Sequence, residues 1–339
     1  MLEIPGQELL REQLERSVRT GRVAHANLIS GPSGAGKTNL ALEIAQALNC
    51  TADLVPCGSC NQCQRIVTAK HTDVRLIGEA GHGVSIDEIR ELQQDATLVP
   101  FEGRNRVFVI IDAERMSGEA ANSLLKTLEE PPANVYLILL TSNPAALLST
   151  VRSRCRLIEI RPLSPKLIQT YLEEKHGVDP KLAGLISRLS EGRLGWALEA
   201  VANPHLIQDR GEQLDSILDL MSMDYSGRLV RSGELTDRYA RNKQSLIEWI
   251  TLMRQWWRDV LLRKSGRTGQ EVNIDRSDQI QLFAETCSII EAGAAVRDIG
   301  ATIQRLGQNA NARLALDVLF LELPQLSTTT TASAVGLEG

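Results

Sequence analysis

The chain has 339 residues, of which 43% are hydrophobic and 4% aromatic, and its formal net charge is −5. This length allows two or three domains with hydrophobic cores of their own. The acidic balance excludes a protein whose whole surface binds nucleic acid. The scarcity of aromatic residues argues against base stacking as the main mode of binding.

Targeting signals are not evident in the sequence. Residues 1–5 lack the basic start and apolar run of a secretory signal. The apolar stretches Val107–Ile111 and Val135–Leu140 are far shorter than the ~20 residues of a membrane helix. We therefore expect a cytoplasmic protein.

Residues 1–163 alternate between predicted strands and helices. Apolar residues at helical spacing fill Thr38–Asn49, and Ser85 with Glu88 forms a capping box that starts another helix. Two of the strands are near-continuous apolar runs, as in a parallel sheet covered on both faces. This predicts an α/β domain with helices on both faces of the sheet. Its predicted strands are Asn27–Ser30, Val74–Ile77, Arg106–Asp112, Val135–Ser142 and Cys155–Ile160.

The remainder of the chain is predicted to be helical. Ser164 and Pro165 are suited to the N-cap and the first position of a helix. The apolar spacing predicts a small helical unit over residues 164–204 and an all-helical domain over residues 205–326. The Ser- and Thr-rich end, residues 327–339, is predicted to be disordered.

A glycine-rich loop lies between the first predicted strand and the helix after it, and it matches the phosphate-binding pattern G-x-x-x-x-G-K-[ST]. Its glycines let backbone N–H groups turn toward one anion, and the positive end of the helix points the same way. The lysine can reach the β- and γ-phosphates, and the threonine can ligate Mg²⁺. The predicted nucleotide-binding residues are Gly31, Ser33, Gly34, Gly36, Lys37 and Thr38.

The third predicted strand ends in Asp112, where P-loop proteins hold Mg²⁺ through a water. Hydrolysis in this class also needs a Glu directly after that Asp, and here the position is Ala113. Glu114 follows, but along an extended segment its side chain would point to the other face. We therefore predict binding of ATP or ADP with Mg²⁺ and weak or absent hydrolysis. The alternative is that Asp112 only ends the strand.

Four of the six cysteines lie within fourteen residues, in the arrangement C-x₆-C-x₂-C-x₂-C. Tetrahedral Zn²⁺ needs four ligands, and C-x₂-C turns suit that geometry. Because all four positions are filled, the pattern predicts a structural zinc module at residues 50–63. An iron–sulfur cluster and free or redox-active thiols are the alternatives. The predicted ligands are Cys50, Cys57, Cys60 and Cys63.

Several stretches together resemble the delta-prime and gamma/tau subunits of the bacterial DNA polymerase III clamp loader, which are AAA+ proteins. A cysteine module directly after the first P-loop helix is a feature of that family. The resemblance is specific over about residues 4–160 and rests only on helical content beyond 204. The matching stretches are Gly6-Gln7, Gly21–Ala26, the phosphate loop, His71–Asp73, Val84–Arg90, Asn122–Pro132, Thr141–Asn143 and Arg152–Cys155.

The resemblance implies roles for two further residues. In the family, the arginine that corresponds to Arg154 projects into the ATP site of the neighbouring subunit, where it stabilises charge on the γ-phosphate. Asn143 corresponds to the sensor of the γ-phosphate. The alternatives are that Arg154 is a surface arginine in a basic strip and that Asn143 is a turn residue at the end of a strand. The helical segments 164–204 and 205–326 correspond to a lid and a collar domain.

Two departures from the gamma/tau pattern favour a delta-prime-like subunit. Ala113 replaces the hydrolytic Glu, and Gly195 stands where those subunits carry a nucleotide-sensing lid arginine. The implied partners are the gamma/tau and delta subunits, the sliding clamp and primed DNA. The DNA would be contacted through its sugar-phosphate backbone, and the protein would be associated with the nucleoid. The nucleotidyltransferase activity would belong to partners.

Two other readings stay open. A gamma/tau-like motor ATPase, or another AAA+ remodelling ATPase, should carry Glu at position 113. A small-molecule kinase with a P-loop is disfavoured by the cysteine module and by the long helical C-terminal part.

Overall fold

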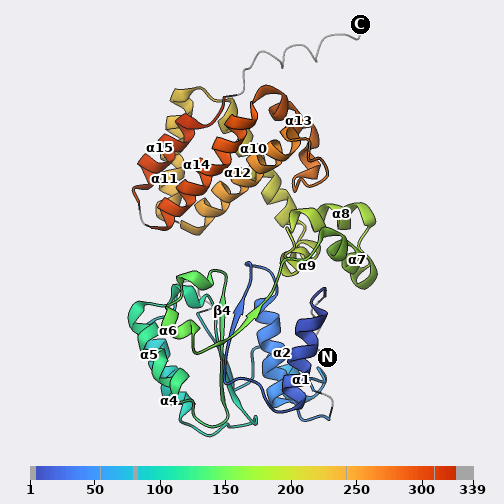
Figure 1. Cartoon of the computed structure of the whole chain (residues 1–339), viewed down its shortest axis with the longest axis vertical. Coiled ribbons are helices and arrows are strands. Elements are labelled where there is room, and N and C mark those ends of the chain that lie inside the picture. The colour runs from blue at the N-terminus through green and yellow to red at the C-terminus, as the bar shows by residue number, and fades with distance from the viewer. Residues whose placement is uncertain (1–4, 54, 79–82, 242, 309, 326–339) are drawn as a thin grey trace. The chain divides into compact units, whose positions relative to one another are not determined.

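The structure is a computed structural model that describes residues 5–53, 55–78, 83–241, 243–308 and 310–325. The chain divides into two compact units (Figure 1). The first consists of Met1–Ala183 with Ser190–Leu198, and the second of Gly184–Leu189 with Glu199–Gly339. The predicted disordered segment 327–339 lies outside the described residues. Within the described part, no helix has the length and apolar content that a membrane crossing requires.

The first unit contains a five-stranded parallel sheet in the order β2-β3-β4-β1-β5. The predicted parallel α/β fold is therefore confirmed. Every residue of β1 and β3 is buried, as their apolar sequences indicate. The strands are β1 (Ala26–Ser30), β2 (Val74–Ile77), β3 (Arg106–Ile110), β4 (Val135–Thr141) and β5 (Arg156–Glu159).

Alternating strand residues form two cores, one on each face of the sheet. Leu28, Phe108 and Leu139 pack on the face covered by α4 and α5, whereas Ile29 and Ile138 pack on the face covered by α1 and α2 (Figure 1). The helices of this part are α1 (Glu8–Arg19), α2 (Lys37–Asn49), α3 (Asn61–Val67), α4 (Ile86–Ala96), α5 (Gly118–Glu129), α6 (Ser149–Arg152) and α7 (Pro165–His176), with short turns η1 (Ala113–Arg115) and η2 (Pro144–Ala146).

Local capping signals begin two of these helices where the sequence indicates. Ser85 caps α4, and Glu88 reaches back to the Ser85 amide, which completes the predicted capping box. Ser164 accepts a hydrogen bond from the Leu167 amide, and Pro165 occupies the first turn of α7. These helix starts depend only on neighbouring residues.

The third predicted strand is shorter than expected. β3 ends at Ile110, and Asp112 has a φ of 48°, in the left-handed region. This conformation turns the chain into η1 instead of extending the strand to Asp112. The prediction of strand over Arg106–Asp112 is therefore wrong at its last two residues, which changes where the following side chains point.

The second unit is built from helices, as expected for the C-terminal part. Its core contains three buried tryptophans, and Trp256 and Trp257 contact the edge of Phe283. Helices α8 (Pro180–Leu189) and α9 (Leu194–Ala202) contribute to both units. The other elements are α10 (His205–Ser222), α11 (Tyr225–Arg241), α12 (Lys243–Lys264), η3 (Ile274–Arg276), α13 (Ser277–Thr286), α14 (Ile289–Gly307) and α15 (Ala312–Glu322).

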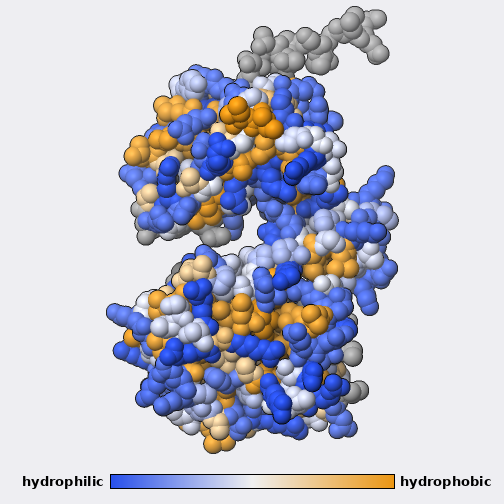
Figure 2. All heavy atoms as spheres, viewed as in Figure 1, coloured by the Kyte–Doolittle hydropathy of each residue, from blue (hydrophilic) through white to orange (hydrophobic). Residues whose placement is uncertain are grey.

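Hydrophobic side chains also reach the surface of both units (Figure 2). On α15, Leu314, Val318 and Leu321 are exposed at a spacing of four and three residues, so they share one face of the helix. In the loop between α4 and β3, Leu98 and Phe101 are also exposed. Grouped apolar residues of this kind are typical of surfaces that contact other molecules.

Candidate nucleotide and metal sites

The phosphate loop joins β1 to α2 with a backbone that only glycine adopts readily. Gly34 and Gly36 have φ angles of 75° and 95°, both in the left-handed region. Gly36 is the N-cap of α2, and Lys37 and Thr38 open that helix of 13 residues. The free N–H groups at the start of α2 therefore face the loop, as an anion site requires.

Lys37 folds back onto the loop. Its Nζ donates hydrogen bonds to the carbonyl oxygens of Gly31 at 2.8 Å and Pro32 at 3.0 Å. Burial lowers the pKa of Lys37, whereas the carboxylates of Glu114 and Asp112 act on it in the opposite direction. The ammonium thus lies within electrostatic reach of both acidic side chains.

The sequence predicts that the Glu114 side chain points to the other face of the sheet, and the structure shows that it does not. Because η1 replaces extended chain, its carboxylate turns back to the end of β4. There Oε1 accepts hydrogen bonds from the Ser142 amide at 2.9 Å and the Ser142 hydroxyl at 2.6 Å. Burial raises the pKa of Glu114, but interactions with Ser142, with its own backbone amide and with Thr141 together outweigh it, and the net shift is downward.

The predicted nucleotide-site residues lie at one edge of the sheet. The carboxyl ends of parallel strands meet there, and the phosphate loop follows β1, Asp112 follows β3 and Asn143 follows β4. The Asn143 side chain is exposed, and the Asn143 backbone N–H donates to the Thr141 hydroxyl at 3.0 Å. This edge is where open α/β sheets bind ligands.

The start of α9 packs directly on the phosphate loop, which sequence reasoning did not anticipate. The Trp196 amide donates to the Gly34 carbonyl at 3.2 Å. A Cβ added at Gly195 would lie 2.7 Å from the same oxygen, so only glycine fits. Arg193 is engaged elsewhere, since its Nε donates to the Ser190 carbonyl and its guanidinium lies over the Trp196 ring.

A cavity of about 210 Å³ with a mixed polar and apolar lining opens beside the loop within the first unit. Gln7 lines it and holds the backbone of Arg161 through two hydrogen bonds, at 3.2 and 3.3 Å. Other lining residues are Gly36, Leu40, Ile160, Tyr171, Leu194 and Leu198.

Arg154 lies away from these residues. It precedes β5, at the amino ends of the strands, which is the sheet edge opposite the phosphate loop. Its side chain is 35% exposed, forms an ion pair with Glu129 at the end of α5 and donates to the Thr150 carbonyl at 3.0 Å. The structure therefore does not bring Arg154 together with the nucleotide-site residues of its own chain.

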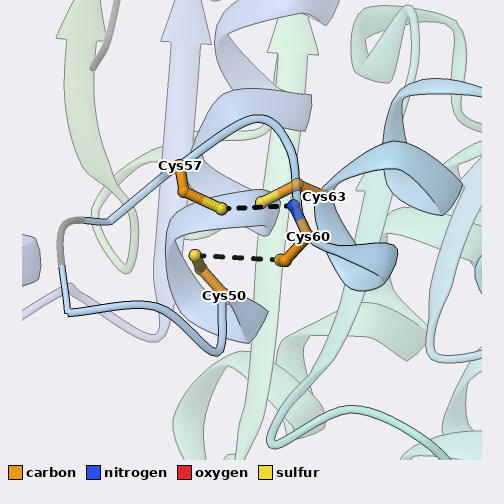
Figure 3. A group of neighbouring side chains, drawn as sticks. All are labelled: Cys50, Cys57, Cys60 and Cys63. Carbon is orange, nitrogen blue, oxygen red and sulfur yellow. Dashed lines mark hydrogen bonds between the residues drawn. The ribbon is translucent and has the colours of Figure 1, made fainter.

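The four predicted metal ligands converge between α2 and α3 (Figure 3). Their sulfur atoms all lie within 4.8 Å of one another. Tetrahedral zinc with Zn–S bonds of about 2.3 Å requires sulfur spacings of about 3.8 Å. Cys50 ends α2, Cys60 caps α3 and Cys63 lies in its first turn, so the helix ends hold the thiols in place. The donor set fits a closed structural site.

The thiols of this group differ in acidity. Hydrogen bonds from the Thr51 and Cys63 amides lower the pKa of Cys60 to about 6, and burial raises the pKa of Cys63 to about 12. The Cys60 amide in turn donates to Cys57 Sγ at 3.3 Å and lowers the pKa of Cys57. Thiolates are the form that binds metal, and the lowered pKa values of Cys60 and Cys57 favour that form.

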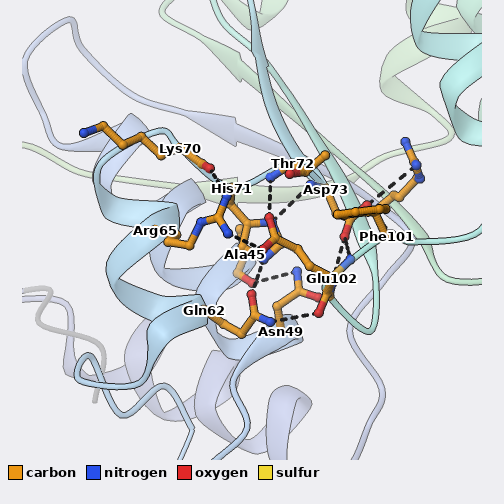
Figure 4. A network of polar contacts seen from close by, with 12 residues as sticks. Ala45, Asn49, Gln62, Arg65, Lys70, His71, Thr72, Asp73, Phe101 and Glu102 are labelled. Carbon is orange, nitrogen blue, oxygen red and sulfur yellow. Dashed lines mark hydrogen bonds and ion pairs between the residues drawn. The ribbon is translucent and has the colours of Figure 1, made fainter.

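A buried polar network ties this module to the sheet (Figure 4). His71 Nδ1 accepts from the Asp73 amide at 3.1 Å, so Nε2 carries the proton donated to Gln62 Oε1 at 2.5 Å. Arg65 of α3 pairs with Glu102 at 2.5 Å, and Glu102 also accepts from the Thr72 amide. Sequence reasoning assigned no role to these residues, because their partners are distant in the chain.

Asp73 anchors the loop before β3 from within the same network. Its carboxylate accepts hydrogen bonds from the amides of Phe101, Glu102 and Gly103, each at 2.8 Å. Its side chain is fully buried, with Arg106 at 3.7 Å. Three amides directed at one carboxylate hold the exposed 98–101 segment in a defined position.

Comparison with known proteins agrees with the sequence motifs. Residues 6–164 match the family described as DNA polymerase III, delta subunit. The DNA polymerase III subunit delta' of Bacillus subtilis is 34% identical over 200 residues, which are 59% of this chain and 60% of that protein. The tau subunit of Salmonella typhimurium is 35% identical over 203 residues, 58% of this chain and 32% of tau. The matched region thus spans less than two thirds of either relative.

Among solved structures, a DNA polymerase III gamma subunit-related protein from Thermotoga maritima is 21% identical with a TM-score of 0.47, and the match covers 91% of this chain and 97% of that one. The match to the family falls on the region that holds the phosphate loop and the cysteine module. These matches support a bacterial DNA polymerase III clamp-loader subunit, similar to delta-prime and tau over part of its length.

Proposed function

We propose that this chain is a delta-prime-like subunit that helps to load the sliding clamp onto primed DNA. In this proposal it holds a nucleotide statically and supplies Arg154 to the ATP site of a neighbouring subunit. The observation that carries the proposal is the position of Arg154, partly exposed and at the sheet edge opposite its own phosphate loop. An arginine at that edge does not meet the phosphate loop of its own chain, and in this proposal it would serve a site on another protomer.

The nucleotide is proposed to be ATP or ADP with Mg²⁺. Backbone amides of the phosphate loop and Lys37 would hold the phosphates, Thr38 would ligate the metal, and Asp112 would act through a metal-bound water. Asn143 would contact the γ-phosphate. The metal would neutralise charge on the phosphate oxygens. Lys37 contacts the Gly31 and Pro32 carbonyls in this structure, and it would have to leave them to reach the phosphates of the nucleotide.

The cysteine module is proposed to hold one structural Zn²⁺. With all four ligands supplied by the protein, no position is left for substrate, which is typical of a structural site. The ion would fasten the end of α2 to the start of α3. This would stabilise the base of the helix that carries Lys37.

Subunit contacts are proposed for the helical parts of the chain. Residues 164–204 would act as a lid and residues 205–326 as a collar that joins gamma/tau and delta subunits. The exposed stripe of Leu314, Val318 and Leu321 on α15 suits the packing of a partner helix. Contacts to primed DNA would be to its backbone and independent of sequence.

The decisive experiment compares three variants in an assembly with gamma/tau, delta, clamp and primed DNA. We expect Arg154→Ala to lower the rate of the ATP site that it serves by about 10²-fold or more, which removes that site's share of clamp-stimulated ATP turnover. Lys37→Ala should change turnover little. Arg152→Ala, at an exposed neighbouring arginine, is the matched control. A large loss with Lys37→Ala and none with Arg154→Ala would reverse the assignment.

The position of Glu114 supports a second candidate, a gamma/tau-like motor. Its carboxylate acts on Lys37 and is held at the end of β4, so the site contains a second acidic group besides Asp112. The purified chain would then hydrolyse ATP on its own. Vigorous, Lys37-dependent turnover, measured with and without DNA, would favour the motor over the fixed subunit.

A further inference from the structure

The carboxylate of Glu114 is satisfied on one side only. Oε1 accepts two hydrogen bonds from Ser142, at 2.6 and 2.9 Å. Oε2 is buried and has no hydrogen-bond partner among the residues that the structure describes. Because Ser142 fixes Oε1, the carboxylate cannot rotate Oε2 toward bulk water. Leaving one oxygen of a buried carboxylate without a donor is unfavourable, and such groups in native proteins usually mark the place of a ligand or an ordered water.

The surroundings of Glu114 indicate what kind of ligand this is. The Glu114 and Asp112 carboxylates act on the Lys37 ammonium, which donates to the Gly31 and Pro32 carbonyls, and Arg115 lies 3.9 Å from Asp112. The Glu114 carboxylate itself repels a bare triphosphate. It attracts a hydrated divalent cation that arrives together with the phosphates, because water bound to such a cation is a strong hydrogen-bond donor.

We infer that Glu114 is a positioning residue for the hydrated Mg²⁺ of the bound nucleotide, with Oε2 accepting a hydrogen bond from a metal-bound water. This inference rests on the proposed binding of nucleotide at the phosphate loop. It assigns to Glu114 a role that its sequence position, two residues after Asp112, does not suggest. The competing role is structural: Glu114 would only tie η1 to the end of β4 through Ser142.

The two roles predict different effects of Glu114→Gln on the affinities for MgATP and for ATP without magnesium. Glu114→Gln keeps an oxygen that can accept from Ser142 but removes the negative charge. If Glu114 acts on the metal, this variant should bind MgATP about tenfold more weakly, because a hydrated cation loses its acceptor. The same variant should bind ATP in magnesium-free buffer as tightly as the unchanged chain or up to about tenfold more tightly, because a repulsive charge is gone.

The experiment titrates the full-length chain with MgATP and with ATP in magnesium-free buffer, without a chelator that could remove other metals. Glu119→Gln, which removes an exposed carboxylate from the first turn of α5, is the control for overall charge and should leave both affinities unchanged. Ser142→Ala reports the structural tie alone and should weaken both affinities together. Thermal unfolding checks that each variant is folded.

The outcomes separate this inference from the proposal on which it rests. Weaker binding of MgATP together with unchanged or tighter binding of magnesium-free ATP in Glu114→Gln supports the metal role. Equal weakening of both, or no change in either, overturns it while nucleotide binding stands. Failure of the unchanged chain to bind MgATP overturns the nucleotide part of the proposed function, and the inference with it.

Discussion

At the scale of single residues, Arg154 is engaged within its own chain. Its guanidinium pairs with Glu129, and the two side chains are 35% and 49% exposed. An ion pair this accessible to solvent contributes at most about 1 kcal/mol. A γ-phosphate with its multiple negative charges is a stronger partner, so Glu129 would hold Arg154 in place until a nucleotide-bound neighbour arrives.

Removing this ion pair should therefore make Arg154 more available to the ATP site of a neighbouring subunit. We expect Glu129→Gln to raise the clamp-stimulated ATP turnover of the assembly, or the apparent affinity of this chain for the other subunits. The increase should be no more than about fivefold, which is equivalent to about 1 kcal/mol. Glu130→Gln at the adjacent exposed glutamate serves as the control. A loss of turnover as large as that of Arg154→Ala would mean that Glu129 orients the arginine for catalysis instead of retaining it.

How far the sequence predicts the site also differs from residue to residue. The phosphate loop and the four cysteines are contiguous motifs whose function depends on local spacing, and their positions follow from the pattern. Glu114 was misjudged because its direction depends on where β3 ends. That end is set by the left-handed conformation of Asp112. Asp adopts this conformation more readily than most residues, but the apolar pattern of the strand does not show that it does so here.

At the scale of elements, Asp73 organises the loop between α4 and β3. Burial raises the pKa of Asp73, but the amides of Gly103, Phe101 and Glu102 outweigh it and the net shift is downward. A carboxyl whose pKa is lower in the folded state contributes stability above its unfolded pKa, about 4, and loses it as the pH falls through the folded value.

We expect Asp73→Asn to lower the free energy of unfolding of the first unit by about 2–4 kcal/mol at pH 7, because an amide group then faces three N–H donors. The deficit relative to the unchanged chain should shrink as the pH falls below about 4. Denaturant unfolding followed by circular dichroism measures both. Asp87→Asn, at an exposed position of α4, should have little effect at any pH. A deficit that is constant with pH would exclude the charge of Asp73 as its cause.

Elements defined by local signals were predictable, and contacts between distant elements were not. The capping serine of α4 and the Ser-Pro start of α7 act on their own helices. The packing of α9 on the phosphate loop joins Trp196 to Gly34, more than 160 residues apart in the chain. No periodicity in either segment carries information about the other.

At the scale of the whole molecule, the two units offer separate spectroscopic signals. Three of the four tryptophans, Trp249, Trp256 and Trp257, are buried in the helical core of the second unit. The cysteine module belongs to the first. Fluorescence therefore reports mainly the second unit, whereas circular dichroism reports both.

Metal loss should act on one of these signals. We expect elemental analysis to find about one zinc ion per chain, and Cys60→Ser to lose it. The same variant should shift the circular-dichroism transition to lower temperature while the tryptophan transition stays within error. Cys287→Ser, at a cysteine outside the module, should retain the ion. A metal-free chain with an unchanged transition would remove zinc from the description of this protein.

Gly195 lets α9 rest on the phosphate loop, with space for a hydrogen atom and nothing larger. The resemblance to gamma and tau led us to look for an arginine at this position. Arginine at this position would bring a Cβ into the Gly34 carbonyl, whatever the rest of the side chain does. Introducing an arginine at position 195 would therefore require the start of α9 to move away from the phosphate loop, so a single substitution would not be enough.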